Sequence, residues 1–132
     1  MIFIDASFFL AYYNINDIHH NHATKLWNDI ETEKYGIYFT SDYIFNEVIG
    51  VTLRKSGKKN ALIIGQHILK SIIILNIDDH ILSESWNLFS KTNLNFNLVD
   101  CSILTALKLI NAKYLATFDK EFNKLKEIKV IE

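Results

Sequence analysis

The chain has 132 residues, of which 49% are apolar and 22% charged, and its formal net charge is −1. This balance fits one compact domain with a substantial core, which excludes a disordered chain, and it argues against a general nucleic-acid coat. No apolar run approaches the roughly 18 residues of a membrane span, and the lone Cys101 has no partner for an internal disulfide, so we expect a cytoplasmic protein without a membrane partner.

Short apolar strands and helices are predicted to alternate along the chain. The predicted strands are residues 2–5, 37–40, 72–77, 114–118 and 129–131. The predicted helices are residues 6–14, 17–33, 41–56, 58–71, a helix beginning at 78 or 79, and 98–110, followed by a helical turn at 119–125. The expected N-caps are Asp17, Ser41 or Asp42, and Asp78 or Asp79, and the expected helix ends are Gly57 and Asn111.

This alternation predicts an α/β fold in which a parallel sheet is covered by helices on both faces. In such sheets ligands bind at the carboxyl ends of the strands, where the winding reverses. Asp5 closes the first predicted strand and Asp119 follows the fourth. Both acids therefore belong to the same edge of the sheet, and they face each other if the two strands are neighbours.

Four carboxylates stand at strand ends or where apolar residues would be expected, namely Asp5, Glu47, Asp100 and Asp119. The first three lie in the hydrophobic runs MIFID, DYIFNEVIGV and NLVDCSILTAL. An acid in such a run carries a large desolvation cost unless something neutralises it. One divalent cation would neutralise several acids at once, so the pattern predicts a metal site.

Each acid also has a local explanation to be weighed against a metal site. Asp100 falls in the first turn of a predicted helix, where the helix dipole favours an acid, and Asp119 can cap the turn that follows it. Glu47 is mid-helix, on or beside the predicted buried face, and the only arginine, Arg54, is two turns away. One shared site explains the four acids together better than independent local roles do.

A set of carboxylate ligands without histidine or cysteine suits Mg²⁺ or Mn²⁺. These ions commonly hold substrate phosphates, generate a hydroxide-like nucleophile and neutralise charge on phosphate oxygens. The sequence therefore favours metal-dependent hydrolysis of a phosphodiester. In the absence of metal, mutual repulsion should raise the pKa of at least one of the acids.

The chain resembles the PIN-domain ribonucleases, most closely the small VapC-type toxins of prokaryotic toxin–antitoxin pairs. The matching segments are IDASFFLAYY, TSDYIFNEVIGVTLRKSG and LVDCSILTALKLINAKYLATFDKEF. They occur in family order and the similarity covers nearly the whole chain. Ala6 stands where the family often has Thr, and Asn111 where Gly is usual, but no carboxylate is missing.

The resemblance implies a single three-layer PIN-like domain over residues 1–132, with a five-stranded parallel sheet between helices. It assigns the metal site to Asp5, Glu47, Asp100 and Asp119, supported by the hydroxyls of Ser7 and Thr117. It further implies Mg²⁺ or Mn²⁺ as cofactor and single-stranded RNA as substrate, cut to leave 5′-phosphate and 3′-hydroxyl ends. A homodimer and inhibition by a cognate antitoxin protein are also implied.

A basic patch surrounds Gly57 and consists of Arg54, Lys55, Lys58 and Lys59. Such a run is usually a solvated helix end. Arg54 is, however, seven residues from Glu47, which puts both on one helix face about 10 Å apart. We therefore form the hypothesis that the patch guides the RNA backbone towards the metal.

Two further groups of residues have open interpretations. His19 and His22 of the segment HHNH could share a helix face and bind a transition metal, although a polar first helical turn is the more ordinary interpretation. Phe9, Tyr12 and Tyr13 suit either the core or an interface with a second copy or an antitoxin.

Other functions are compatible with parts of the pattern. A free-standing RNA-processing nuclease of the same fold would carry the same acids, and an idle interaction module could retain them. A phospho-receiver module has a similar length and an acidic Mg²⁺ pocket. It would need paired acids after the first strand and a Lys after the fifth, whereas Asp5 stands alone and the chain ends at KVIE.

Overall fold

A computed structural model describes residues 1–132. Its five strands are β1 (Ile2–Ile4), β2 (Tyr38–Ser41), β3 (Ile73–Leu75), β4 (Tyr114–Ala116) and β5 (Lys129–Ile131). They form one sheet in the order β3-β2-β1-β4-β5, and every neighbouring pair is parallel. The predicted α/β fold is confirmed, and β1 and β4 are neighbours.

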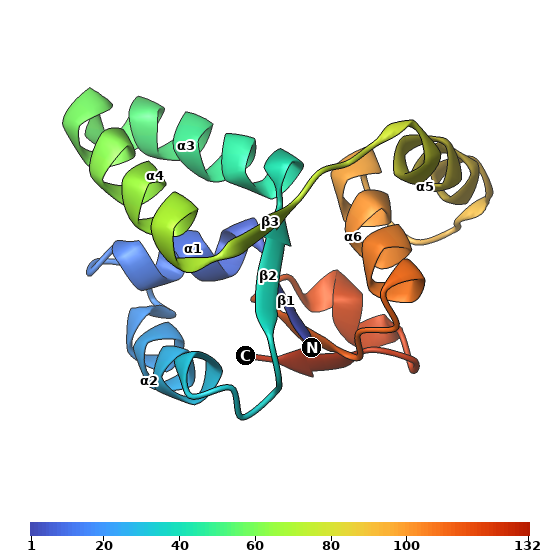
Figure 1. Cartoon of the computed structure of the whole chain (residues 1–132), viewed down its shortest axis with the longest axis horizontal. Helices are drawn as coiled ribbons and strands as arrows, with labels where there is room; N and C mark the ends of the chain where they lie inside the picture. Colours follow the sequence, from blue (N-terminus) through green and yellow to red (C-terminus); the bar gives the residue numbers. More distant parts are fainter.

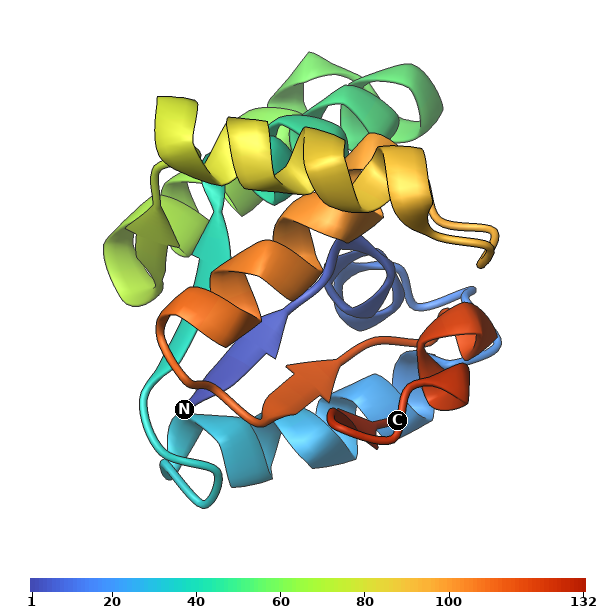
Figure 2. The same cartoon turned by 90° about the vertical axis from the view of Figure 1, so that its right-hand side faces the viewer.

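Helices cover both faces of the sheet (Figure 1). They are α1 (Ala6–Tyr13), α2 (His20–Glu31), α3 (Asp42–Ser56), α4 (Lys58–Ser71), α5 (Asp79–Lys91) and α6 (Leu98–Leu109), with a 3₁₀ turn, η1 (Lys120–Lys124). Helices α1 to α4 lie on one side of the strands and α5 and α6 on the other. Figure 2 shows α6 running alongside β1, with β4 on the other side of that strand. None of these helices is both long and apolar enough to cross a membrane.

Capping residues begin or end several helices where the sequence predicts. The Ser41 hydroxyl accepts a hydrogen bond from the Ile44 N–H at 3.3 Å, and Asp78 Oδ1 accepts one from the Ile81 N–H at 2.9 Å. Gly57, at φ 86°, separates α3 from α4, and Asn111, at φ 51°, takes the left-handed conformation expected after α6.

The centre of the core is β1, whose residues Ile2, Phe3 and Ile4 are completely buried. A continuous apolar run is what a strand covered on both faces requires. The Phe3 ring packs edge-on against Phe39 of β2, with ring centroids 5.1 Å apart. The position of Asp5 is therefore fixed by the best-packed strand of the molecule.

Two predictions need correction. Helix α2 begins at His20 rather than after Asp17, because Asp17 Oδ1 accepts the His19 N–H at 2.8 Å and closes a turn before the helix. The third strand, predicted as buried, is an edge strand in which Ile73 is 61% exposed.

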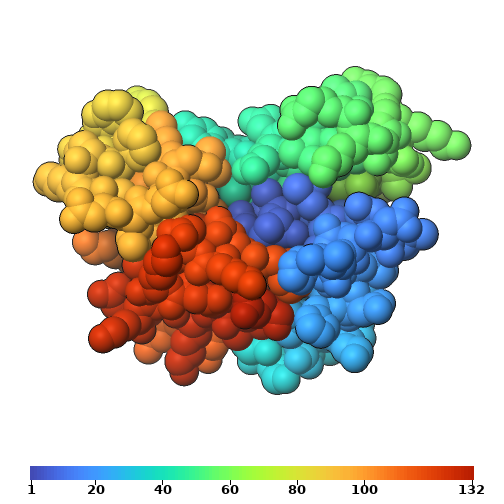
Figure 3. All heavy atoms as spheres, turned by 180° about the vertical axis from the view of Figure 1, so that it is seen from behind, coloured from blue at the N-terminus to red at the C-terminus, as the bar shows by residue number.

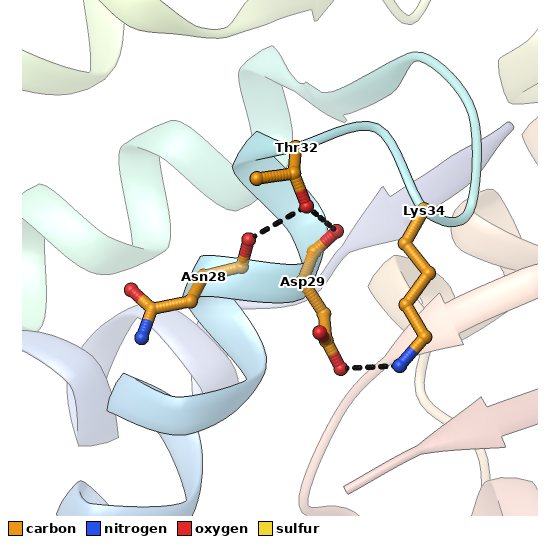
Figure 4. A network of polar contacts seen from close by, with 4 residues as sticks. All are labelled: Asn28, Asp29, Thr32 and Lys34. Carbon is orange, nitrogen blue, oxygen red and sulfur yellow. Dashed lines mark hydrogen bonds and ion pairs between the residues drawn. The ribbon is translucent and has the colours of Figure 1, made fainter.

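The carboxyl end of α2 is closed by a polar network (Figure 4). The Thr32 hydroxyl donates to the main-chain oxygens of Asn28 and Asp29, at 2.9 and 3.2 Å. Lys34 forms an ion pair with the Asp29 carboxylate at 2.7 Å. These contacts turn the chain from α2 towards β2.

Candidate active site

The site begins where β1 and β4 end side by side. Ile4 is paired with Ala116 in the parallel register, and the Asp5 N–H donates to the Ala116 carbonyl at 3.0 Å. Asp5 is buried with 7% of its surface exposed, and Thr117 is completely buried. Asp5 and the segment leading to Asp119 therefore leave the sheet at the same edge, as predicted.

Two hydroxyls hold one oxygen of Asp5. Asp5 Oδ2 accepts hydrogen bonds from Ser7 Oγ and Thr117 Oγ1, each at 2.7 Å, and a longer one of 3.4 Å from the Ser7 N–H. Glu121 Oε2 is the only buried side-chain oxygen or nitrogen without a hydrogen bond. Asp5 Oδ1 also has no hydrogen bond, so it must be exposed to solvent. One carboxylate oxygen is fixed and the other is available to a ligand.

The two hydroxyls are themselves held by main-chain donors. The Phe118 N–H donates to Ser7 Oγ and the Asp119 N–H to Thr117 Oγ1, each at 3.0 Å. Each hydroxyl has one proton and gives it to Asp5, so the 3.0 Å contact between Ser7 Oγ and Thr117 Oγ1 carries none. The main chain of 118–119 thus orients the proton donors towards Asp5.

Asp100 both caps a helix and contributes to the acidic site. Its N–H donates to Asn97 Oδ1 at 2.9 Å, and its Oδ2 accepts the Asn97 N–H at 2.8 Å, which is a capping box at the start of α6. The predicted local role is therefore real, yet Asp100 also raises the pKa of Glu47 through its charge. The two interpretations do not exclude each other.

Asp119 and Glu47 differ in their hydrogen bonding, because only the Asp119 side chain has a partner. Asp119 Oδ1 accepts the Glu121 N–H at 2.9 Å as the N-cap of η1, which confirms its predicted capping role. Glu47 lies on α3 beside the buried Val48, makes no hydrogen bond through its side chain and is exposed. Its expected place on or beside the buried face is thus only partly correct, and Asp5 is the one acid of the four that is buried.

The acids influence one another electrostatically. Burial raises the pKa of Asp5, and the hydrogen bonds from Ser7 and Thr117 partly offset this. Desolvation raises the pKa of Glu47, and the charges of Asp5 and Asp100 raise it further. Desolvation, with a smaller contribution from the charges of Asp5 and Asp119, raises the pKa of Asp100 to about 6. Raised pKa values were predicted, but desolvation outweighs repulsion as their cause.

No basic side chain neutralises these acids. The ion pairs of the chain are Lys34–Asp29 and Lys124–Glu121, and neither includes any of the four carboxylates. No three Asp, Glu, His or Cys side chains are close enough together to form a complete ligand set for a metal. An oxygen-only donor set without an internal counter-charge nevertheless fits a hard divalent cation.

None of the other candidate side chains is hydrogen-bonded to the four carboxylates. His19 and His22 belong to no group of three or more possible metal ligands. All four residues of the basic patch are exposed. Lys55, Phe9 and Tyr13 line a cavity of about 420 Å³ between α1, α3 and α4, which none of the four acids reaches.

A family model for the PIN domain matches residues 2–128 of the chain. The chain belongs to the PIN domain family. PIN domains are nucleases, so this membership supports a nuclease role. A search of curated proteins found no match to the sequence.

Solved structures share the fold of this PIN domain. VapC20 of Mycobacterium tuberculosis, described as a sarcin–ricin loop cleaving toxin, has a TM-score of 0.88 at 19% identity, with all of both chains covered. FitAcB from Neisseria gonorrhoeae has a TM-score of 0.71 at 14% identity, covering 100% of this chain and 97% of that one. PAE2754 from Pyrobaculum aerophilum has a TM-score of 0.68 at 15% identity, covering 98% and 88%.

Sequence reasoning missed Asn97, which pairs with Asp100 at the start of α6 of this PIN domain. The signal was available, because N-L-V-D directly before an apolar run is a capping-box pattern. It also missed the contact of His19 with Phe118, whose ring centroids are 4.4 Å apart. Those residues lie 99 positions apart, and no local pattern connects them.

Proposed function

We propose that this PIN domain is a metal-dependent endoribonuclease that cleaves single-stranded RNA. The observation that carries the proposal is the Asp5 carboxylate, which is buried, held on one oxygen by two hydroxyls and surrounded by acids that no base neutralises. Desolvated, uncompensated carboxylates are costly unless a cation joins them. Membership of the PIN domain family supports the nuclease activity.

Asp5, Glu47, Asp100 and Asp119 would hold Mg²⁺ or Mn²⁺, directly or through water. When bound, the ion would activate water and neutralise charge on the scissile phosphate. Asp5 would offer Oδ1, because its Oδ2 is occupied by Ser7 and Thr117. Asp100 would likewise offer Oδ1, because its Oδ2 accepts the Asn97 N–H. The remaining role, orienting or deprotonating the attacking water, falls to one of the four acids.

The basic patch of Arg54, Lys55, Lys58 and Lys59 would guide the RNA backbone. The Arg54 guanidinium folds back along α3, with Nη1 3.5 Å from the point that a Cβ on Gly50 would occupy. This brings its charge one turn nearer to Glu47 along the same helix. Exposed cations without protein partners are suited to phosphate contacts.

The double substitution Lys58→Glu and Lys59→Glu tests this path. Fewer phosphate contacts should weaken RNA binding and reduce the slope of log K against log salt concentration by about one to two. As a control, Lys126 before β5 and Lys129 within it are replaced with Glu, which makes the same charge change. An unchanged slope in the Lys58/Lys59 variant rejects the proposed path.

We further propose that the protein is the toxin of a toxin–antitoxin pair, a homodimer in the cell and inhibited by an antitoxin protein. The structural likeness to VapC20, itself described as a toxin, supports this role. A free-standing RNA-processing nuclease remains the alternative, and a neighbouring reading frame for a small DNA-binding protein would favour the toxin. The phospho-receiver alternative fails, because β3 lies at the sheet edge, whereas in the receiver order it is central.

RNA cleavage in Mg²⁺ or Mn²⁺ tests the activity directly. Wild type should cut single-stranded RNA, while Asp5→Asn and Asp100→Asn should lose most activity, because each removes a charged ligand while preserving shape. Asp29→Asn, at the exposed ion pair with Lys34, serves as the control. Equal cleavage by wild type and both site variants would contradict the proposed mechanism. If no RNA is cleaved by any of the proteins, the result favours an interaction module without catalytic activity.

A further inference from the structure

Three aromatic rings form a stack that runs from the core to the surface beside the acidic site. The Phe8 and Phe118 rings are parallel within 3° with centroids 5.9 Å apart, and the Phe118 and His19 rings are parallel within 7° at 4.4 Å. Phe8 is completely buried, whereas Phe118 and His19 are half-buried. The stack is thus anchored at one end and reaches solvent at the other, where His19 lies.

Two of the three rings are chain neighbours of the residues that hold Asp5. Phe8 follows Ser7, and Phe118 stands between Thr117 and Asp119. The Phe118 N–H donates to Ser7 Oγ at 3.0 Å, and that hydroxyl donates to Asp5 at 2.7 Å. In Figure 3 the C-terminal segment and the α1–α2 region lie side by side on one face of the molecule. The stack therefore flanks the site rather than a remote part of the surface.

Helix capping does not account for the His19 ring. His19 is the N-cap of α2, a position that favours Ser, Thr, Asp and Asn, and its side chain makes no capping hydrogen bond. Its main-chain N–H is satisfied by Asp17 and its carbonyl by the Ala23 N–H. The His20 ring, in contrast, is hydrogen-bonded to the Ala11 carbonyl. The His19 ring contacts an aromatic stack and keeps both ring nitrogens free of protein partners.

A flat, anchored ring of this kind is what an unpaired base requires. Proteins that bind single-stranded RNA stack its bases on Phe, Tyr, Trp or His rings, and a free ring nitrogen can add a hydrogen bond. We infer that His19, backed by Phe118 and Phe8, is a stacking platform for a base of single-stranded RNA next to the scissile phosphate. This inference rests on the proposed ribonuclease function and adds to it a place where the substrate is recognised through a base.

Binding of a short single-stranded RNA that carries 2-aminopurine at successive positions tests the platform. The protein is Asp5→Asn, which keeps the RNA intact, with and without further substitutions. His19→Ala should weaken binding about 5- to 150-fold and restore the fluorescence of the stacked base. His19→Phe should stay within about threefold of the parent, because it keeps a flat ring. His22→Ala is the matched control, since it removes a nearby exposed imidazole that stacks on no ring.

These binding and cleavage measurements distinguish a failure of the stacking platform from a failure of the proposed ribonuclease function. If His19→Ala and His22→Ala bind alike, or if His19→Phe is as weak as His19→Ala, the platform is wrong even though wild type cleaves RNA. If wild type cleaves no RNA and the parent binds none, the proposed function fails and the platform with it. Phe118→Leu provides a second variant, which keeps apolar bulk but removes the backing ring, and it should weaken binding in the same direction.

Discussion

Asp5 depends on its two hydroxyl partners more than on any other contact. Thr117→Val removes one donor to Asp5 and the acceptor of the Asp119 N–H while preserving shape. A hydrogen bond to a charged group contributes about 1.5–3 kcal/mol, so we expect kcat/KM for RNA cleavage to fall about 10- to 150-fold.

Thr40→Val is the matched control for that substitution. Thr40 is as buried as Thr117, but its hydroxyl donates to the Ile4 carbonyl at 2.8 Å and is hydrogen-bonded to no acid. It should cost about 1 kcal/mol of stability and leave kcat/KM within about threefold. Similar losses of activity in both variants would contradict the role assigned to Thr117.

Asp100 gives the metal-free protein a specific pH dependence. Its pKa is about 6 in the folded state, whereas the ordinary value of an aspartate is 3.8, so as pH rises the unfolded chain loses the proton first. Asp100 therefore lowers stability between about pH 4 and pH 6, and the loss persists at higher pH. Asp100→Asn removes this effect and still accepts the Asn97 N–H.

In EDTA at pH 7 we expect Asp100→Asn to be more stable by about 1 kcal/mol, after allowing for solvent screening of a half-exposed group. This corresponds to a rise in Tm of roughly 4 °C, measured by thermal unfolding. The difference should shrink towards pH 4, where the wild-type carboxyl is protonated in the folded state and increasingly so in the unfolded chain. A variant that is less stable than wild type at pH 7 would contradict the raised pKa.

At the residue scale, the sequence predicted that Asp5 and Asp119 lie at one edge of the sheet, but not how deeply each of the four acids is buried. Asp5 and Asp119 could be found because they follow strands that a parallel sheet brings to one edge. The exposure of Glu47 could not be predicted, because helical spacing defines a face of the helix but not how far a neighbouring element covers that face. The stack of His19 on Phe118 depends on where the α1–α2 turn meets the β4–η1 segment, which is a tertiary property.

At the scale of elements, the start of α6 links helix capping to the site. Asn97→Ala removes the acceptor of the Asp100 N–H and should loosen the carboxylate that the capping box orients. Asp78→Ala removes an equivalent cap from α5, also at 2.9 Å, away from the acids. Each should cost about 1 kcal/mol in chemical denaturation.

Only Asn97→Ala should also lower kcat/KM, by about three- to tenfold, and Asn97→Ser should restore most of it because serine is a good N-cap. Activity is compared at equal folded fraction, so that a loss of stability alone has no effect. If Asp78→Ala lowers kcat/KM as much, the capping box stabilises the helix without positioning Asp100.

Element boundaries were predictable where a local cap decides them. Ser41, Gly57, Asp78 and Asn111 act at the predicted positions, because their hydrogen bonds or φ angles need only nearby residues. The start of α2 was not predictable in this way, because the Asp17 side chain, which can cap a helix, instead closes a turn before it. Strand β3 was expected to be buried, because its apolar sequence does not reveal that it lies at the sheet edge.

At the scale of the whole molecule, the sheet order creates the site. Because β1 is central and pairs with β4, Asp5 and Asp119 leave adjacent strands, while α3 and α6 bring Glu47 and Asp100 from opposite faces of the sheet (Figure 1). Alternation of strands and helices predicts a parallel sheet but leaves several strand orders open. The order had to come from the family resemblance or from the structure.

The most direct test of a shared metal site is a Mn²⁺ titration followed by electron paramagnetic resonance of the free ion. Wild type should bind Mn²⁺ saturably at one class of site near neutral pH. Asp5→Asn and Asp100→Asn should each weaken that binding at least about tenfold, and Asp29→Asn should not. Equal Mn²⁺ binding by all four proteins, or no binding by wild type, would contradict the proposal that the four acids form one metal site.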